Sequence, residues 1–306
     1  MLSLRSLIVR ALVVPVACLL IAANIAGAET NTIPVSALPQ NARLALCGDS
    51  ITEQRLYTKY VEVYLKACAG RNDISVFQFG WGGENADQFI NRINRGDLDA
   101  FVPTAVTYLY GANDGAGMAW QSWMETMWTG CNNGILSALA TKYPAAGNST
   151  VMCSPTFFDL NSSGVEPSVS NDTLGRFRDL SLTMAQGNGK GFTDVRQRMM
   201  ESGLAARAAL GTSFRFGGND GVHAGPNGHL MIAHEILTAL GCDGSVGTIS
   251  VDMSGAASAS AGHTVVSSSG GAVTVDSSRY PFCYNYDGST AADRMATILP
   301  YLPFSQ

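Results

Sequence analysis

The stretch Leu44-Ala45-Leu46-Cys47-Gly48-Asp49-Ser50-Ile51-Thr52 joins an apolar run to a polar turn. Residues 44–47 have the character of a short buried strand, and Ser50 follows at its carboxyl end. Open α/β sheets bind ligands at the carboxyl ends of their strands, so the stretch predicts an α/β domain with Ser50 at a ligand site. Thr52 stands where a second glycine would complete Gly-x-Ser-x-Gly, so the usual nucleophile elbow is not indicated.

Further apolar runs alternate with amphipathic stretches along the chain. The predicted strands are residues 44–47, 74–79, 105–109 and 151–153. The predicted helices are residues 56–68, 120–142, 174–185 and 226–240. Pro226 suits the first turn of the last helix, and Gly241 suits its end. Alternation of this kind predicts parallel strands with helices on both faces of the sheet.

After Gly244 the composition changes to that of a β-rich extension. Residues 248–253 and 272–275 alternate apolar and polar side chains, and small residues fill the predicted loops 254–262 and 267–271. We expect this extension to brace the sheet edge, with a sugar-binding accessory as the alternative. Its apolar end has no evident closing element, so the chain is either complete or a fragment of a longer protein.

The first 28 residues have the pattern of a secretory signal peptide. Arg5 and Arg10 form a basic n-region, residues 11–23 form an apolar h-region, and Ala26-Gly27-Ala28 gives a small-residue cleavage site. An uncleaved membrane anchor is the alternative, but the apolar run is short for a membrane span and contains Pro15. We therefore predict secretion to the extracellular space or the periplasm, with no stable membrane insertion after cleavage.

The predicted domains are thus a signal peptide (1–28), an α/β domain (29–244) and a β-rich extension (245–306). Removing residues 1–28 takes away two arginines and no acid, which changes the formal net charge from −5 to −7. An acidic chain without a lysine- and arginine-rich run has no electrostatic footprint for nucleic acid or an anionic membrane. We therefore predict no nucleic-acid partner.

Six of the seven cysteines lie outside the predicted signal peptide, and six cysteines allow 15 pairings. Cys47 and Cys153 end strand-like runs and are predicted to be buried thiols. A bridge between Cys242 and Cys283 would tie the extension to the main domain, and the other pairings stay open. The chain has no Cys-x-x-Cys or His-x-x-x-His cluster, so we predict no metal site.

A second polar segment, Asp220-Gly221-Val222-His223, supplies the partners that a serine nucleophile needs. The serine hydroxyl needs a base, and the imidazole needs an acceptor that fixes its tautomer. The alternative is that Asp220 caps the helix beginning at Pro226 and that His223 is a surface histidine. Of the four histidines, only His223 has a carboxylate at this spacing within a Gly-rich loop. The others lie on the predicted last helix or in the extension.

Two further segments can stabilise an oxyanion. Phe79-Gly80-Trp81-Gly82-Gly83-Glu84 follows the second predicted strand, and Gly111-Ala112-Asn113-Asp114 follows the third. A glycine there can present its backbone N–H at close range, and Asn113 adds a side-chain amide at the same edge of the sheet. Losing one such donor typically costs roughly 3–4 kcal/mol of transition-state stabilisation. Each segment alone is an ordinary strand-to-helix turn, but four matching segments are hard to assign to chance.

As a set, these segments resemble the sequence blocks of the SGNH (GDSL-type) hydrolase superfamily. The matching blocks are Gly48-Asp49-Ser50, the Gly82-Gly83 turn, Gly111-x-Asn113-Asp114 and Asp220-x-x-His223. The resemblance covers about residues 42–242. It implies a flavodoxin-like three-layer α/β/α sandwich with a parallel central sheet. It also implies hydrolysis of acyl esters without a cofactor.

Carried over by position, Ser50 would be the nucleophile, His223 the general base and acid, and Asp220 the orienting carboxylate. Ser50, Gly83 and Asn113 would donate the hydrogen bonds of the oxyanion hole. Gly83 is preferred to Gly80 because it precedes an acidic residue, as the glycine of this block often does in the superfamily. The neighbours Trp81-Gly82 and Glu84-Asn85 depart from the residues usual there, which leaves the substrate preference open.

Export and the aromatic residues Trp81, Tyr110 and Trp120 near the predicted site favour a carbohydrate substrate, although core packing explains any single one equally well. We predict a serine esterase acting on short, acetyl-type esters of carbohydrates or small molecules. The enzymatic alternatives are a lipase or lysophospholipase, against which the absence of an obvious long apolar lid counts, and a glycan acyltransferase. The alternative from another class is a non-catalytic glycan-binding protein. The oligomeric state stays open.

Overall fold

The computed structural model describes residues 30–115, 117–164, 167–252, 254–269, 272–280, 282 and 294–303. The predicted signal peptide and Cys283 lie outside these residues, so cleavage and the pairing of Cys242 with Cys283 stay predictions. Within the described ranges, no helix combines the length and the apolar character needed to cross a membrane.

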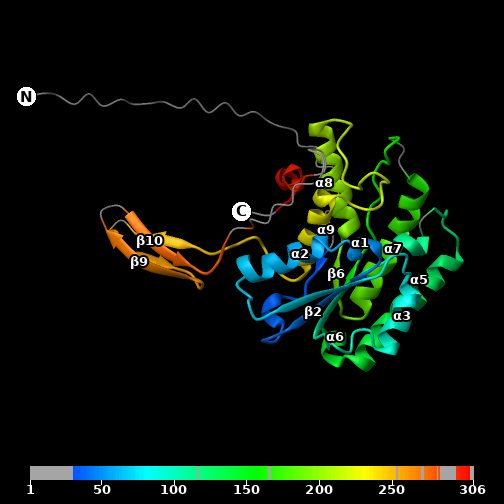
Figure 1. Ribbon diagram of the computed structural model, residues 1–306, viewed down its shortest axis with the longest axis horizontal. Coiled ribbons are helices and arrows are strands. Elements are labelled where there is room, and N and C mark those ends of the chain that lie inside the picture. Colours follow the sequence, from blue (N-terminus) through cyan, green and yellow to red (C-terminus); the bar gives the residue numbers. More distant parts are fainter. Residues whose placement is uncertain are drawn as a thin grey trace, which may run out of the picture.

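A six-stranded sheet forms the centre of the α/β part (Figure 1). In spatial order its strands are β1 (Thr30–Asn31), β6 (Gly191–Thr193), β5 (Thr150–Cys153), β4 (Ala105–Leu109), β2 (Arg43–Gly48) and β3 (Ser75–Gly80). All neighbouring pairs are parallel except β1 with β6 at the edge. Leaving β1 aside, the strands follow the order 2-1-3-4-5, which confirms the flavodoxin-like prediction.

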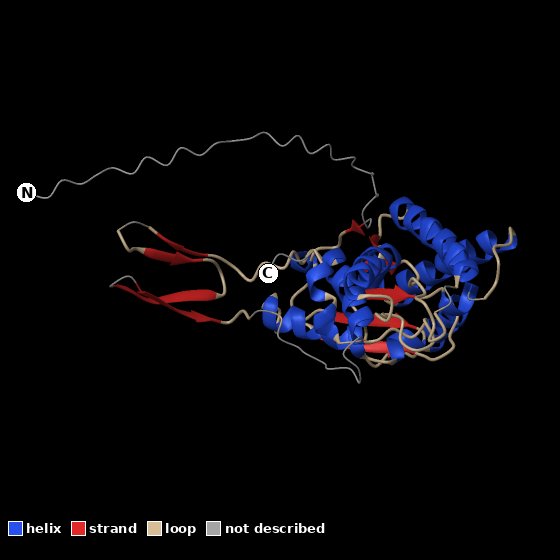
Figure 2. Cartoon of the chain, turned by 90° about the horizontal axis from the view of Figure 1, so that it is seen from above, coloured by secondary structure: helices blue, strands red, loops and turns tan. Residues whose placement is uncertain are grey.

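Helices cover both faces of this sheet (Figure 2). One face carries α2 (Leu56–Val63), α8 (Val195–Leu210) and α9 (Pro226–Ala239), with α9 packed between the other two. The other face carries α3 (Ala86–Arg95), α5 (Trp123–Lys142) and α7 (Ser168–Gly187). Three short helices lie in the connections: α1 (Ser50–Glu53), α4 (Ala112–Gly115) and α6 (Pro144–Asn148). The structure is therefore the predicted three-layer sandwich.

The predicted strand 105–109 coincides with β4, and the other three predicted strands agree with β2, β3 and β5 within one residue at each end. Helix α9 ends one residue before its prediction, and α5 begins three residues after its own. The predicted helix 56–68 is α2 followed by a π-helical turn, Tyr64–Cys68. Period-3.6 patterning does not distinguish these two helix types, because both bury the same side of the segment.

The core lies on both faces of the sheet, as parallel strands covered by helices require. Every residue of β4 is buried, and Leu44 and Leu46 of β2 are fully buried. Burial of one such aliphatic side chain contributes roughly 1.5–3 kcal/mol. Cys47 and Cys153 are buried thiols, as predicted. This core fixes the positions of β2 and β4, whose carboxyl ends lie side by side at one end of the sheet.

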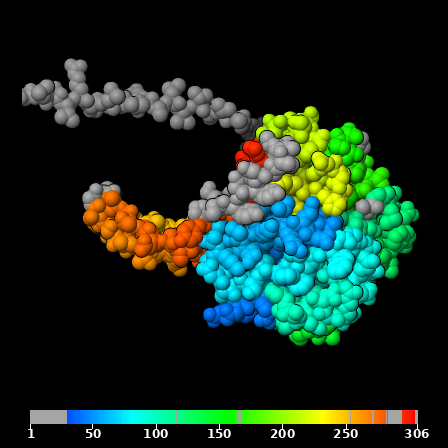
Figure 3. Space-filling view, viewed as in Figure 1, coloured from blue at the N-terminus to red at the C-terminus, as the bar shows by residue number. Residues whose placement is uncertain are grey.

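The extension contains β7 (Ile249–Val251), β8 (Ala257–Ala259), β9 (His263–Ser269) and β10 (Ala272–Ser277), paired antiparallel in two small sheets. This confirms the β-rich prediction, although β8 and the end of β9 occupy segments predicted as loops. We call residues 249–277 the β-arm. Figures 1 and 3 show it pointing away from the α/β body. The β-arm therefore does not brace the sheet edge, whereas later residues of the extension pack on the main domain.

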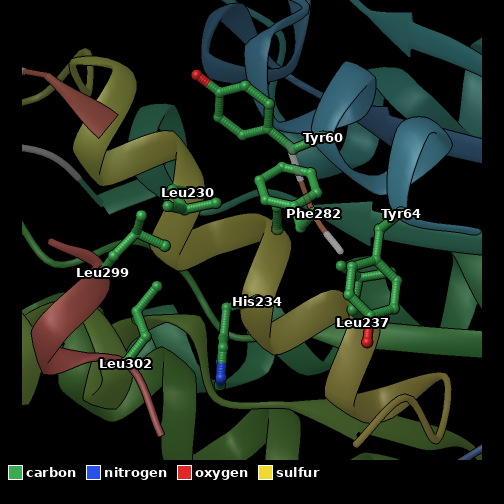
Figure 4. A pocket seen from close by; sticks show the side chains of 9 residues that line it. Tyr60, Tyr64, Leu230, His234, Leu237, Phe282, Leu299 and Leu302 are labelled. Atoms are coloured by element: carbon green, nitrogen blue, oxygen red, sulfur yellow. The ribbon is translucent and has the colours of Figure 1, made fainter. Parts of the chain in front are cut away.

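The segment that follows the β-arm packs on the main domain. The Tyr280 N–H donates to Ala67 O at 2.9 Å, and the Phe282 ring lies 6.2 Å from the Tyr60 ring. Together with the C-terminal 3-10 turn Leu299–Tyr301, this segment closes an apolar pocket of about 230 Å³ over α2 and α9 (Figure 4). None of the predicted site residues lines this pocket.

Candidate active site

Ser50 is the first residue of α1 and follows β2 after a single residue, Asp49. The Asp49 carboxylate caps the helix by accepting the Ile51 N–H at 2.9 Å. The N–H of a first helical residue has no acceptor within the helix, so that of Ser50 stays available to a ligand. Gly48 makes this turn possible, because a Cβ at that position would lie 2.1 Å from Thr52 Oγ1 and 2.7 Å from Leu109 O.

The hydroxyl of Ser50 contacts the imidazole of His223, 173 residues further along the chain. The distance from Ser50 Oγ to His223 Nε2 is 2.8 Å, and His223 Nδ1 lies 2.7 Å from Asp220 Oδ2. The side chains of His223 and Asp220 are 41% and 53% exposed. A serine, an imidazole and a carboxylate are thus joined in the order that nucleophilic catalysis needs, at an open edge of the sheet.

The Asp220 carboxylate holds both the backbone and the ring of His223. Its Oδ1 accepts the N–H groups of Val222 and His223, each at 2.9 Å, while its Oδ2 contacts the ring. Partial burial by itself would raise the pKa of Asp220, but the hydrogen bonds from His223 and from the two backbone N–H groups lower it below the usual range. The carboxylate therefore stays ionised and favours an Nδ1-protonated imidazole.

Residues 81–84 form a tight turn that lies on α1. The Trp81 N–H donates to Gly48 O at 3.0 Å, and the Glu84 N–H donates to Trp81 O at 3.2 Å. Gly83 has φ +75°, which places the third residue of this turn in the left-handed region that favours glycine. A Cβ at Gly82 would lie 2.7 Å from the Glu53 carboxylate at the end of α1. The turn therefore brings Gly83 to the same edge as Ser50.

Asn113 lies in α4, directly after β4, and its side chain is exposed. Its Nδ2 donates to Glu84 O at 3.0 Å, so the second hydrogen of the amide remains for a ligand. Asp114 fixes the segment, because its buried carboxylate accepts the N–H groups of Gly111 (3.1 Å) and Ala86 (3.0 Å). Burial raises the pKa of Asp114 to about 6. The structure thus joins Asn113 to the turn that carries Gly83.

Glu84 supports this arrangement in a way that the sequence did not indicate. Its buried Oε2 accepts hydrogen bonds from Arg92 Nη1 and Tyr110 Oη, each at 2.7 Å. Burial raises the pKa of Glu84 despite these two donors. The side chain ties the Trp81–Glu84 turn to α3 and to the end of β4. In the sequence, only its position directly after Gly83 distinguishes Glu84 from other acidic residues.

Asp159 is a second supporting residue that sequence patterns did not reveal. Its buried carboxylate accepts the N–H groups of Phe216 (2.7 Å) and Gly217 (3.1 Å) and forms an ion pair with Arg207 of α8. Its own N–H donates to Gly221 O at 2.8 Å. Asp159 therefore fixes the loop that carries Asp220 and His223 to the segment after β5.

The remaining histidines and aromatic residues considered from the sequence take no part in the contacts between Ser50, His223 and Asp220. His229 and His234 are buried on α9, and burial lowers the pKa of His229 to about 3, so its ring is a neutral packing group. Tyr110 is buried as well, and its ring is therefore not available to a sugar. Trp81, by contrast, is 57% exposed. Among the described residues, no group of three or more His, Cys, Asp or Glu side chains could hold a metal ion.

Solved structures share this fold. A gut microbial diltiazem-metabolizing enzyme superimposes with a TM-score of 0.67 at 21% identity, covering 87% of this chain and 64% of that enzyme's length. A variant of an acetyl-xylooligosaccharide esterase from Geobacillus stearothermophilus superimposes with a TM-score of 0.52 at 19% identity, covering 67% of this chain and 96% of that esterase. Identities this low establish the fold. A comparison with curated proteins gave no match.

The sequence also matches the model of the GDSL-like lipase/acylhydrolase family over residues 46–231. The matched region begins in β2 and ends in α9, so it contains every predicted site residue and more than half of the chain. It agrees with the resemblance that the four sequence segments indicate. The chain therefore belongs to the GDSL-like lipase/acylhydrolase family, whose members are serine hydrolases that cleave ester bonds.

Proposed function

We propose that this protein is a secreted serine esterase that hydrolyses short, acetyl-type esters carried by carbohydrates. The observation that carries the proposal is the continuous contact from Ser50 Oγ to His223 Nε2 (2.8 Å) and from His223 Nδ1 to Asp220 (2.7 Å). Ser50 acts as the nucleophile, His223 as general base and acid, and Asp220 as the orienting carboxylate.

In the first step neutral His223 takes the proton of Ser50 while Oγ attacks the ester carbonyl carbon. The carbonyl oxygen becomes an oxyanion that accepts hydrogen bonds from the Ser50 N–H, the Gly83 N–H and the Asn113 amide. Asp220 stabilises the imidazolium that forms. His223 then gives its proton to the leaving alcohol as the C–O bond breaks, which leaves an acyl group on Ser50.

In the second step water replaces the alcohol. His223 takes a proton from the water as its oxygen attacks the acyl carbon, and the same donors hold the second oxyanion. Collapse of this intermediate returns the proton to Ser50 Oγ and releases the carboxylic acid. The cycle needs no group beyond the residues named, and both half-reactions use one base in its two protonation states.

A short acyl group on a sugar is supported by three observations. The open, partly exposed site has the exposed Trp81 ring beside the Gly83 turn. The apolar pocket of about 230 Å³ over α2 and α9 contains none of the predicted site residues. A protein of the same fold acts on acetylated xylo-oligosaccharides. A lipase with a long acyl tunnel has no comparable support.

The test compares hydrolysis of p-nitrophenyl acetate, butyrate and octanoate by the mature protein and by Ser50→Ala. We expect turnover to fall with acyl length and Ser50→Ala to lose roughly 10⁴-fold or more of kcat. Ser258→Ala, an exposed serine in the β-arm, is the matched control and should retain full activity. Unchanged hydrolysis by Ser50→Ala would sink the proposed mechanism.

The same assay separates the alternatives. A preference for octanoate would indicate a lipase or lysophospholipase. Transfer of the acyl group to an added sugar, seen by product analysis with and without the acceptor, would indicate an acyltransferase. A folded protein without turnover on any ester would favour a glycan-binding protein.

Export belongs to the proposal as well, and it is supported by the n-region, h-region and Ala26-Gly27-Ala28 pattern of the first 28 residues. N-terminal sequencing of the protein recovered from the periplasm or the culture medium should begin near Glu29. Recovery of the protein from the cytoplasm with its first residues intact would contradict this part.

A further inference from the structure

A second cavity adjoins the turn that carries Gly83. It has a volume of about 350 Å³, within the range of roughly 300–1,000 Å³ usual for small-molecule sites. One wall is the Trp81–Glu84 turn, and the other is the outer face of α3. Gly83, one of the proposed oxyanion donors, itself lines this cavity, so the cavity adjoins the proposed site on that side.

Trp81 gives this cavity an aromatic wall in a fixed position. Its side chain is 57% exposed and lines the cavity. The guanidinium of Arg92 lies 5.4 Å from the ring centroid, and Arg92 is itself buried. The backbone of Trp81 is held by Gly48 and Glu84. A planar ring anchored in this way offers an apolar surface without the entropy cost of ordering a mobile side chain.

The opposite wall is polar but carries no net charge. Gln88, Asn91 and Arg95 lie at spacings of three and four residues, so they share one face of α3. The Gln88 Oε1 accepts the Asn85 N–H at 2.9 Å, and the residue is exposed, so its amide NH₂ can donate to a ligand. Arg95 is paired with Asp97 at 2.8 Å.

Arg92, the second cation of the cavity, is paired with Glu84 at 2.7 Å and with Asp97 at 3.1 Å. Two carboxylates therefore compensate the two guanidinium groups. A site built to attract an anion would instead leave a cation uncompensated. The cavity thus presents one apolar ring face and several hydrogen-bonding groups to a neutral ligand.

We propose that Trp81, Gln88 and Asn91 form a subsite for a neutral glycosyl residue of the ester substrate, next to the residue that carries the acyl group. This rests on the proposed esterase function and adds the position and chemistry of substrate recognition to it. One face of the sugar ring packs on the Trp81 indole, and the sugar hydroxyls bond the amides of Gln88 and Asn91. This combination is typical of small polar ligands with an apolar face.

The test measures kcat and KM of wild type, Trp81→Ala and Trp81→Phe on acetylated xylo-oligosaccharides and on p-nitrophenyl acetate. For Trp81→Ala we expect the ratio of kcat/KM on the saccharide to kcat/KM on p-nitrophenyl acetate to fall about tenfold, mostly through KM, which is the size of one aromatic contact. Trp81→Phe should restore most of the ratio. Asn91→Ala should lower it in the same direction.

Trp123→Ala is the matched control, since Trp123 is 53% exposed and does not line the cavity, and it should leave the ratio unchanged. An unchanged ratio in Trp81→Ala, with both substrates slowed equally, would overturn the subsite and leave Trp81 as a support of the turn. A preference of the wild type for acetylated uronic acid oligosaccharides over neutral ones would overturn the neutral assignment. Absence of turnover on every ester by the wild type would instead refute the proposed function.

Discussion

At the scale of single residues, Asp220 is unusual for a carboxylate proposed to orient a catalytic histidine, because it is 53% exposed. Water can solvate it, so its effect must come from geometry: three hydrogen bonds converge on its two oxygens, and two of them come from His223. An amide in its place could offer its N–H₂ to the ring and favour the wrong tautomer.

We therefore expect Asp220→Asn to lower kcat by roughly 10³- to 10⁴-fold on p-nitrophenyl acetate while the fold is retained. Asp172→Asn is a suitable control, since Asp172 is an exposed carboxylate on α7 that is paired with Arg176. A loss smaller than tenfold would indicate that solvent water can replace Asp220 as the partner of His223.

Asp49 makes the stability of the fold depend on pH. Burial raises its pKa to about 7, whereas an aspartate in an unfolded chain titrates near ~4. Between these pH values the folded protein keeps a proton that the unfolded chain has lost. The contribution of Asp49 to stability is therefore fully present below about pH 4 and is lost as the pH rises through about 7.

Between about pH 4 and about pH 8, Asp49 should lower the unfolding free energy of the wild type by roughly 2–4 kcal/mol. We expect this part of the pH dependence to be absent in Asp49→Asn. Urea denaturation at the two pH values measures this difference. Asp276→Asn, at an exposed position in the β-arm, should keep the wild-type pH dependence. Identical pH slopes in wild type and Asp49→Asn would contradict the assignment.

At the scale of elements, the loop between α8 and α9 depends on one buried ion pair. Asp159 and Arg207 are 0% and 14% exposed, and Asp159 also holds two backbone N–H groups of the loop. Removing the cation would leave the carboxylate buried without a counter-charge, which typically costs 3–5 kcal/mol, whereas an exposed ion pair is worth about 0–1 kcal/mol.

We expect Arg207→Met to lower the unfolding free energy by roughly 3–5 kcal/mol and to lower kcat, because the loop positions His223. Arg176→Met, which breaks the exposed pair with Asp172, should cost less than about 1 kcal/mol. Chemical denaturation and p-nitrophenyl acetate assays on both variants check this. Equal destabilisation by the two changes would show that the buried Asp159–Arg207 pair stabilises the protein no more than an exposed ion pair does.

The elements that sequence patterns predicted are those with a strong apolar signal. β2 and β4 are short runs of apolar residues, and α9 has both Pro226 and Gly241 at its ends. α3 was not predicted, because six of its ten residues are polar, although Ala86, Phe89 and Ile93 are buried along one side. β6 has three residues, which is too short for periodicity.

The residues of the candidate site likewise include some that the sequence indicated and some that only the structure reveals. Ser50, Asn113, Asp220 and His223 follow strands or lie in a Gly-rich loop, so their position along the chain indicated them. Glu84 and Asp159 act through contacts between segments far apart in sequence, with Arg92 on α3 and Arg207 on α8. Such partners become evident only when the helices are placed on the sheet. The exposure of Trp81 likewise depends on how closely α3 approaches the turn.

At the scale of the whole molecule, the β-arm stands apart from the proposed chemistry. Its two ends lie close together: His263 Nε2 contacts Val246 O at 2.7 Å, and His263 also pairs with Ser277 in the β9–β10 ladder. The chain therefore leaves and re-enters the main domain at nearly the same point. Arg279, Tyr280 and Phe282, which pack near α2, follow the β-arm.

This geometry predicts that a short Gly-Ser linker can replace residues 247–277. Because the β-arm adds little burial to the α/β core, the thermal midpoint should fall by only a few degrees and p-nitrophenyl acetate hydrolysis should stay near the wild-type rate. Loss of the fold would show that the β-arm stabilises the main domain after all. If activity is lost on acetylated xylo-oligosaccharides but not on p-nitrophenyl acetate, the β-arm helps to hold the glycan. Combining the deletion with Trp81→Ala would then separate the two contributions, because the effects of independent sites add.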